Sequence, residues 1–143
     1  MEHLTQEEAI LVQLGIWASA LHILRNKRLD YSGEVDPFGN FRRSELRGVP
    51  AWLGCMIRND DKFARREVIM KRGGEAHVKN ETLIDTWADS TNYVSIEAGL
   101  EIEILPNRTE LLRNLTDIAH DLPDLVQFYL DKALLEKEDN GTT

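Results

Sequence analysis

The chain has 143 residues, of which 17 are basic and 25 acidic, so its net charge is −8. Its length suits one domain, and 42% hydrophobic residues exclude wholesale disorder. The acidic balance argues against a nucleic-acid coat or a basic membrane-surface protein. The single cysteine, Cys55, excludes an intrachain disulfide and a cysteine-based zinc site.

The start of the chain lacks the basic residues of a signal peptide, and the longest apolar stretch, residues 9–24, is interrupted by Gln13 and His22. That stretch falls short of a membrane span. We therefore expect a soluble cytoplasmic protein with one domain over residues 1–138 and a flexible tail over 139–143.

Hydrophobic spacing predicts five helices and almost no strand. They cover residues 4–28, 50–72, 81 to at least 96, 109–120 and 122–138. Thr5 and Glu8 have capping-box spacing for the first helix, and Asn80 can cap the third. Residues 100–105 alternate apolar and acidic, so they fit either a short strand or the end of the third helix. The predicted fold is an all-α bundle with a long loop over residues 29–50.

Charge is segregated along the chain. Residues 25–72 hold 12 basic and 7 acidic residues, whereas residues 73–143 hold 5 basic and 15 acidic residues. A basic segment within an acidic protein indicates a local anion site, and phosphate is the commonest such anion. Solvated helix faces explain the same counts equally well.

The second predicted helix carries a stripe that is apolar except for Asp61. Its members are Ile57, Asp61, Ala64 and Val68. If this face meets the core, Asp61 needs a partner, and Arg58 and Arg65 lie within reach on the same helix. Asp61 then either forms a structural ion pair or contributes to a ligand or metal site.

The third predicted helix places Glu81, Asp85 and Asp89 close to one face. Carboxylates stacked at this spacing repel one another unless a cation lies among them, and hard oxygen ligands suit Mg²⁺ or Mn²⁺. A solvated acidic face is the alternative. Asn92 and Tyr93 continue the same helix and offer further polar contacts.

The loop before the second helix supplies aromatic, amide and basic groups. Tyr31, Phe38 and Phe41 could stack on a base, and Asn40 could bind a base edge. Three arginines could meet phosphates, namely Arg42, Arg43 and Arg47. The alternative is that the aromatic side chains pin the loop to the core.

These pieces occur in an order that resembles a known family. The order is Lys27-x-x-Asp30-Tyr31, then Gly39-Asn40-Phe41, then Arg58-x-x-Asp61-Lys62-x-x-Arg65, then Asn80-Glu81-x-x-x-Asp85-x-x-x-Asp89-x-x-Asn92-Tyr93. Over residues 5–96 the chain resembles the phage and bacterial nucleotide-modification-associated domain. More distantly, it is similar to the MazG-type all-α nucleoside triphosphate pyrophosphohydrolases.

The resemblance implies a cytoplasmic homo-oligomer, in the host cytoplasm if the protein is phage-encoded, that cleaves a nucleoside triphosphate with Mg²⁺. It implies catalytic roles for Glu81, Asp85 and Asp61, and metal binding by Glu81, Asp85 and Asp89. Glu81 and Asp85 match the family's E-x-x-x-D pair, whereas the second helix lacks its E-E-x-x-E pattern and offers Asp61 instead. The implied nucleotide-binding residues are Lys27, Asp30, Tyr31, Asn40, Phe41, Arg58, Lys62, Arg65, Asn92 and Tyr93.

Three interpretations remain open on the sequence. The first is a Mg²⁺-dependent pyrophosphohydrolase, and the second is a protein that binds or sequesters a nucleotide or cyclic nucleotide without cleaving it, for example a phage anti-defence protein. The third is an interaction protein whose last two helices bind a partner through Leu111, Leu112, Leu115 and Ile118. The acidic C-terminal half disfavours nucleic acid as a partner.

Overall fold

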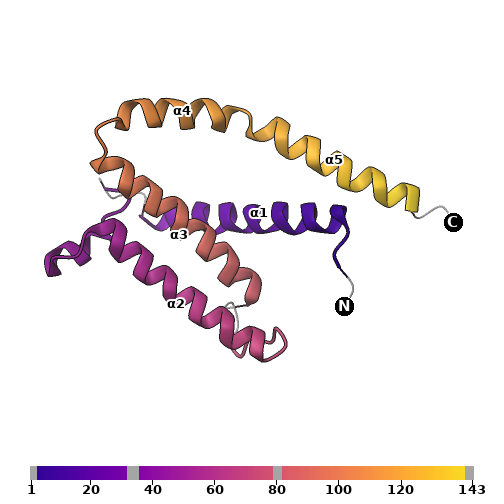
Figure 1. The fold of residues 1–143 in the computed structure, drawn as a ribbon, viewed down its shortest axis with the longest axis horizontal. Coiled ribbons are helices and arrows are strands. Elements are labelled where there is room, and N and C mark those ends of the chain that lie inside the picture. The colour runs from indigo at the N-terminus through magenta and orange to yellow at the C-terminus, as the bar shows by residue number, and fades with distance from the viewer. Residues whose placement is uncertain (1–2, 32–35, 79–81, 141–143) are drawn as a thin grey trace. The chain divides into compact units, whose positions relative to one another are not determined.

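The structure is a computed structural model that describes residues 3–31, 36–78 and 82–140, and side chains at 3–27, 36–78 and 82–134. Every regular element in these residues is a helix, which confirms the predicted all-α class (Figure 1). The five predicted helices are present, and a short 3₁₀-helix, η1, adds order to the predicted loop. The elements are α1 (Gln6–Tyr31), η1 (Arg42–Arg47), α2 (Ala51–Lys71), α3 (Leu83–Ile104), α4 (Arg108–His120) and α5 (Leu122–Asn140).

The helix ends follow capping chemistry. The predicted capping box before α1 is confirmed, because the Thr5 amide donates to the Glu8 carboxylate at 2.9 Å and the Glu8 amide donates to the Thr5 hydroxyl at 3.2 Å. The predicted start of α3 is wrong, because Thr82 caps this helix in a second capping box with Asp85. The previously proposed cap, Asn80, lies outside the described residues.

Two other boundaries differ from those predicted. Residues 100–104 are helical, so the choice between strand and helix end is settled in favour of the helix, which ends before Pro106. At the C-terminus, α5 continues to Asn140, two residues into the predicted tail.

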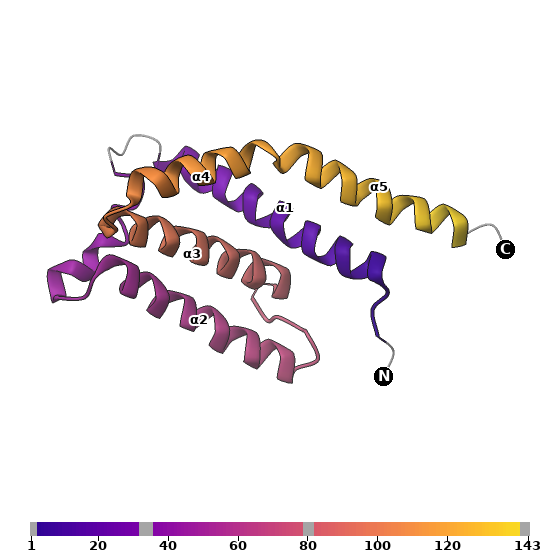
Figure 2. The ribbon, with the colours of Figure 1, turned by 45° about the horizontal axis from the view of Figure 1, so that its top comes forward.

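The chain divides into two units. One consists of Met1–Gly15 with Asn107–Thr143, and the other of Ile16–Pro106. Helix α1 contributes to both units. In the first unit, α5 follows α4 almost end to end instead of folding back on it (Figures 1 and 2).

Helix α1 contains a long apolar stretch. An 18-residue window within Gln6–Lys27 has a mean hydropathy of 1.2, and 6% of that window is buried. By length and composition this stretch could cross a membrane, contrary to the expectation from residues 9–24. Signal segments and core helices of soluble proteins meet the same criterion.

The second unit is organised around α2 and α3, which lie side by side and run in opposite directions (Figures 1 and 2). Contacts at two levels fix this pairing: Cys55 donates from its thiol to the Tyr93 carbonyl at 3.4 Å, and Lys62 pairs with Asp89. A small buried cluster joins the helices and the loop before them. It contains Phe41, Ala51, Cys55 and Leu100, with Phe38, Trp52, Tyr93 and Ile96 packed against it.

Two glycines allow close approach around this cluster. A Cβ at Gly54 of α2 would lie 2.5 Å from the Ser44 hydroxyl of η1. A Cβ at Gly99 of α3 would lie 2.9 Å from the ring of Phe38. Glycine at these positions therefore brings η1 and the Phe38 ring onto the helices, where they hold Phe41 in place.

Arg42 ties the loop to the C-terminal end of α3. Its guanidinium donates to the carboxylate of Asp36 and, at 2.8 Å, to both carboxylate oxygens of Glu103. The hydrogen bond from Arg42 is the main reason that the pKa of Asp36 lies below its usual value. This contact joins segments 61 residues apart and fixes the path of residues 36–41.

The predicted core-facing stripe of α2 is wrong. Ile57, Asp61, Ala64 and Val68 are all exposed, and the buried residues of α2 are Ala51, Cys55, Asn59 and Ile69. The helix thus has two faces that carry apolar residues. The face that α3 and η1 cover contains Asn59 and Lys62. Because these two residues are polar, the hydrophobic pattern of the sequence favoured the stripe from Ile57 to Val68 as the core-facing side.

Candidate functional site

The site is built around Asp89, on the side of α3 that faces α2. One carboxylate oxygen of Asp89 lies 3.0 Å from the ammonium of Lys62 in α2, and the other lies 3.5 Å from that of Lys27 in α1. The side chains of Asp89 and Lys62 are each 20% exposed, whereas that of Lys27 is 56% exposed. Three helices therefore bring charged groups to one point of the fold.

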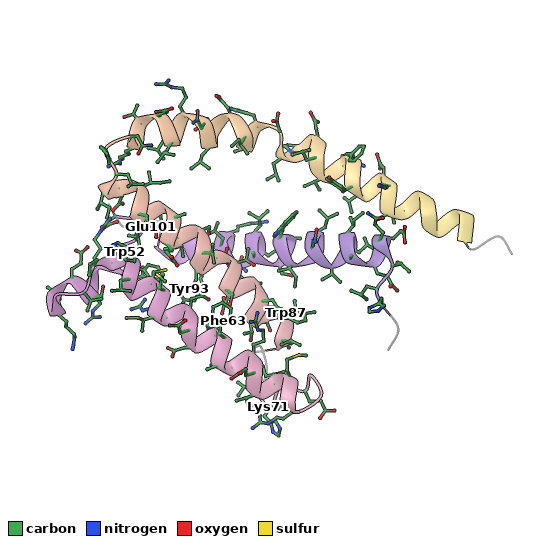
Figure 3. The ribbon with its side chains drawn as sticks, viewed as in Figure 1. Trp52, Phe63, Lys71, Trp87, Tyr93 and Glu101 are labelled. Carbon is green, nitrogen blue, oxygen red and sulfur yellow. The ribbon has the colours of Figure 1, made fainter. Side chains whose placement is uncertain are left out.

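One turn before Lys62, Arg58 lies over an aromatic pair. Its guanidinium carbon is 5.0 Å from the centroid of the Phe41 ring, and it donates to the carbonyl of Asn40 at 3.3 Å. Phe41 meets Tyr93 of α3 edge to face, with centroids 5.9 Å apart. Figure 3 shows Tyr93 on the side of α3 next to α2. Asn40 and Arg58 are exposed, and Phe41 is buried.

Two buried amides lie on the helix faces that carry these groups. Asn92 donates to the Ala20 carbonyl of α1 at 2.9 Å, which fixes α1 against α3 at this level. Asn59 is 4% exposed, and its side-chain oxygen has no hydrogen-bond partner among the described residues. A buried oxygen that lacks any donor costs about 1–3 kcal/mol, so an unpaired amide at this position is unusual in a helix interface.

Three basic side chains gather in this region. We call Lys27, Arg58 and Lys62 the cationic cluster; the two lysines face the carboxylate of Asp89. The neighbouring Cys55 thiol is buried, and burial, aided by the charge of Glu97, raises its pKa to about 11. Cys55 is therefore protonated at neutral pH and acts as a core residue, not as a nucleophile.

The structure brings together six of the residues that the sequence analysis predicted to bind a nucleotide or a metal. They are Lys27, Phe41, Arg58, Lys62, Asp89 and Tyr93. Two more border the group through their hydrogen bonds, namely Asn40 and Asn92. Arg65 lies on the same side of α2 as Lys62, three residues later, and also makes an interaction of its own.

Other predicted residues lie elsewhere. Asp61 is exposed on α2, and no described contact links it to Asp89. Asp85 is engaged at the start of α3, where its carboxylate accepts from the Thr82 hydroxyl at 2.7 Å and the Thr82 amide at 3.0 Å. Glu81 lies outside the described residues, as do the side chains of Asp30 and Tyr31.

The carboxylates do not form a metal site in the part of the chain that the structure describes. No group of three or more His, Cys, Asp or Glu side chains is placed there to hold an ion. Asp85 serves as a helix cap, and both oxygens of Asp89 face lysines. Because Glu81 lies outside the described residues, the Mg²⁺ ion that the resemblance implies stays a prediction, and we assign no chemical step to a metal.

Sequence reasoning missed Asn59 and the Asp36–Arg42–Glu103 contact. Asn59 follows Cys55 by four residues and precedes Lys62 by three, so helical spacing places all three on one face of α2. Taking the apolar Cys55 as a core position would therefore have identified Asn59 as a buried residue. The Arg42 contact joins distant segments, and no local pattern reveals it.

Comparisons of this chain with protein families, curated proteins and solved structures found no match.

Proposed function

We propose that this protein binds a phosphorylated small molecule of the nucleotide class at the cationic cluster. The observation that carries the proposal is the convergence of Lys27 and Lys62 on one carboxylate, next to an arginine that stacks on an aromatic ring. Clustered Lys and Arg side chains bind phosphates, and aromatic side chains and arginine planes bind bases.

Asp89 has a definite role in this proposal. Without a ligand, its carboxylate holds the two ammonium groups near each other and offsets their repulsion. A phosphate group is also an anionic oxygen acceptor, so it can share or replace these contacts without rearrangement of the helices. Preorganisation of this kind lowers the entropic cost of binding.

Binding is better supported than cleavage. The clustering of Lys27, Lys62 and Arg58 supports binding of a phosphate, whereas the carboxylate of Asp85 caps α3 and that of Asp61 is exposed. The pyrophosphohydrolase interpretation thus predicts turnover that depends on Mg²⁺, and the binding interpretation predicts that the ligand is recovered unchanged.

A thermal-shift screen tests the proposal. The full chain is heated with each common ribo- and deoxynucleotide and with inorganic phosphate, with and without Mg²⁺, and the nucleotides are then analysed by chromatography. We expect at least one nucleotide to raise the Tm and to be recovered intact. No shift with any nucleotide would contradict the proposal, and Mg²⁺-dependent release of pyrophosphate would replace it by the hydrolase interpretation.

Variants locate the binding. Lys62→Gln and Arg58→Gln should each weaken the nucleotide by about tenfold, which corresponds to about 1.4 kcal/mol. Lys71→Gln is the matched control, because Lys71 is an exposed basic residue of the same helix at its far end (Figure 3). Equal losses in all three variants would indicate a general charge effect and not this site.

A further inference from the structure

A buried acceptor without a partner lies beside the cationic cluster. Asn59 of α2 is 4% exposed, and its side-chain oxygen accepts no hydrogen bond from any described residue. About 90% or more of the buried polar groups in proteins have a partner, so this oxygen is an exception. An amide oxygen accepts hydrogen bonds and cannot donate them, so the partner that fits it is an N–H or O–H group.

The donors on the same face of α2 as Asn59 bind other acceptors. The thiol of Cys55, four residues earlier, donates to the carbonyl of Tyr93. The ammonium of Lys62, three residues later, pairs with Asp89. By helical spacing, Asn59 lies between these two contacts on the face that packs on α3. Neither neighbour satisfies the oxygen, and a donor from outside the chain can do so.

Asn59 also lies between the groups proposed to bind the two ends of a nucleotide. Lys27 and Lys62 form the phosphate end. Arg58, over the ring of Phe41, forms the base end. The rise of an α-helix separates Arg58 from Lys62 by about 6 Å along α2. In a nucleotide the sugar joins the base to the phosphate, so the hydroxyl groups of the sugar are the donors that come closest to Asn59.

We propose that Asn59 accepts a hydrogen bond from a sugar hydroxyl of the bound nucleotide and so selects ligands by their sugar. This inference rests on the proposed function, because it places the nucleotide at the cationic cluster. The cost of burying the oxygen is incurred when the protein folds, so a hydroxyl that reaches it gains the hydrogen bond without further desolvation of Asn59. A nucleotide without that hydroxyl leaves the oxygen unpaired and binds more weakly.

The oxygen of Asn59 becomes accessible when Lys62 moves. A helical side chain leans toward the N-terminal end of its helix, so the stem of Lys62 covers the turn that contains Asn59. A phosphate that replaces Asp89 as the partner of the Lys62 ammonium draws this stem aside. Binding at the phosphate end thus opens the sugar contact through the motion of one side chain, without movement of α2 or α3.

Sugar analogues test this role by calorimetric titration into the full chain. Adenosine, guanosine, cytidine and uridine triphosphates are each compared with their 2′-deoxy, 3′-deoxy and 2′,3′-dideoxy forms. For the bases that bind, the dideoxy form should have a Kd about tenfold higher than the ribonucleotide, which is the expected effect of one hydrogen bond. One of the two singly deoxygenated forms should account for this loss and so identify the hydroxyl.

Two variants separate this inference from the nucleotide site itself. Asn59→Leu keeps the branched shape of the side chain without an acceptor, so ribonucleotide and dideoxy form should bind it equally well; Asn59→Ala is the second variant if leucine prevents folding. Lys62→Gln should weaken every form and keep the difference between them.

The outcomes distinguish the two proposals. Equal Kd values for ribonucleotide and dideoxy form in wild-type protein would overturn the role of Asn59 and leave the nucleotide site standing. A sugar preference that persists in the folded Asn59 variants would also overturn it, because another residue would then bind the hydroxyl. No binding of any form would overturn both proposals.

Discussion

The ion pairs at Asp89 predict two different coupling energies. Lys62 and Asp89 are 3.0 Å apart with both side chains 20% exposed, whereas Lys27 is 3.5 Å away with a side chain 56% exposed. Exposed pairs contribute about 0.2–1 kcal/mol, and breaking a buried pair costs about 3–5 kcal/mol. The Lys62 pair lies between these classes, so we expect a coupling of about 1.5 kcal/mol, against about 0.5 kcal/mol or less for Lys27.

Double-mutant cycles measure these couplings. The variants are Lys62→Met, Lys27→Met and Asp89→Asn with the two double variants, and the free energy of unfolding is obtained from urea denaturation followed by circular dichroism. Methionine keeps much of the lysine stem, which limits the loss of packing. Added salt should weaken the Lys27 coupling more than the Lys62 coupling, because the exposed pair is screened more. Equal couplings for the two lysines, or none for Lys62, would refute this reasoning.

Three further predictions concern stability and reactivity. Gly99→Ala should lower the free energy of unfolding by about 1 kcal/mol, because crowding against Phe38 outweighs the gain in helix propensity. Gly15→Ala is the control and should not lower it, because a Cβ at Gly15 would meet no atom within 4 Å. A Gly99→Ala chain that is more stable than wild type in urea denaturation would contradict this prediction. Burial is the main reason that the pKa of Glu97 lies above its usual value, so the folded chain holds this proton more tightly and stability falls as pH rises from the usual pKa through the raised one. Glu97→Gln should therefore be more stable than wild type at neutral pH and no more stable in acid below both pKa values, as thermal denaturation at several pH values would show. The thiol of Cys55, with its pKa raised to about 11, should resist a thiol reagent in the native chain and react once urea unfolds it; rapid native labelling would show that the thiol is accessible.

The all-α class and the five long helices could be predicted because they depend on local signals. Helical spacing of apolar residues, the Thr5–Glu8 capping box and Pro106 at the end of α3 each act over a few residues. The start of α3 was misplaced because Asn80 and Thr82 are both good caps, and only the Thr82–Asp85 hydrogen bonds decide between them.

The buried face of α2 could not be predicted in the same way. Its central positions are Asn59 and Lys62, which an apolar template rejects, and the partner of Lys62, Asp89, is distant in the sequence. The exposed stripe through Ile57 and Val68 looks more like a core face in sequence.

The sequence predicted the basic residues of the candidate site but not the contacts of Asp89. Charge segregation pointed to residues 25–72, and the motif order singled out Lys27, Arg58 and Lys62. The role of Asp89 differs in the structure, since it faces two ammonium groups, whereas the acidic spacing suggested a metal ligand. Spacing along one helix cannot show which charges a neighbouring helix supplies.

Calorimetric titration of a nucleotide into the full chain tests the central claim most directly. With the nucleotide that gives the largest thermal shift, wild-type protein and the Lys71→Gln control should bind with the same Kd, and Lys62→Gln should bind about tenfold more weakly. An unchanged Kd in Lys62→Gln, or no heat of binding to wild-type protein, would contradict the assignment of the cationic cluster as a nucleotide site.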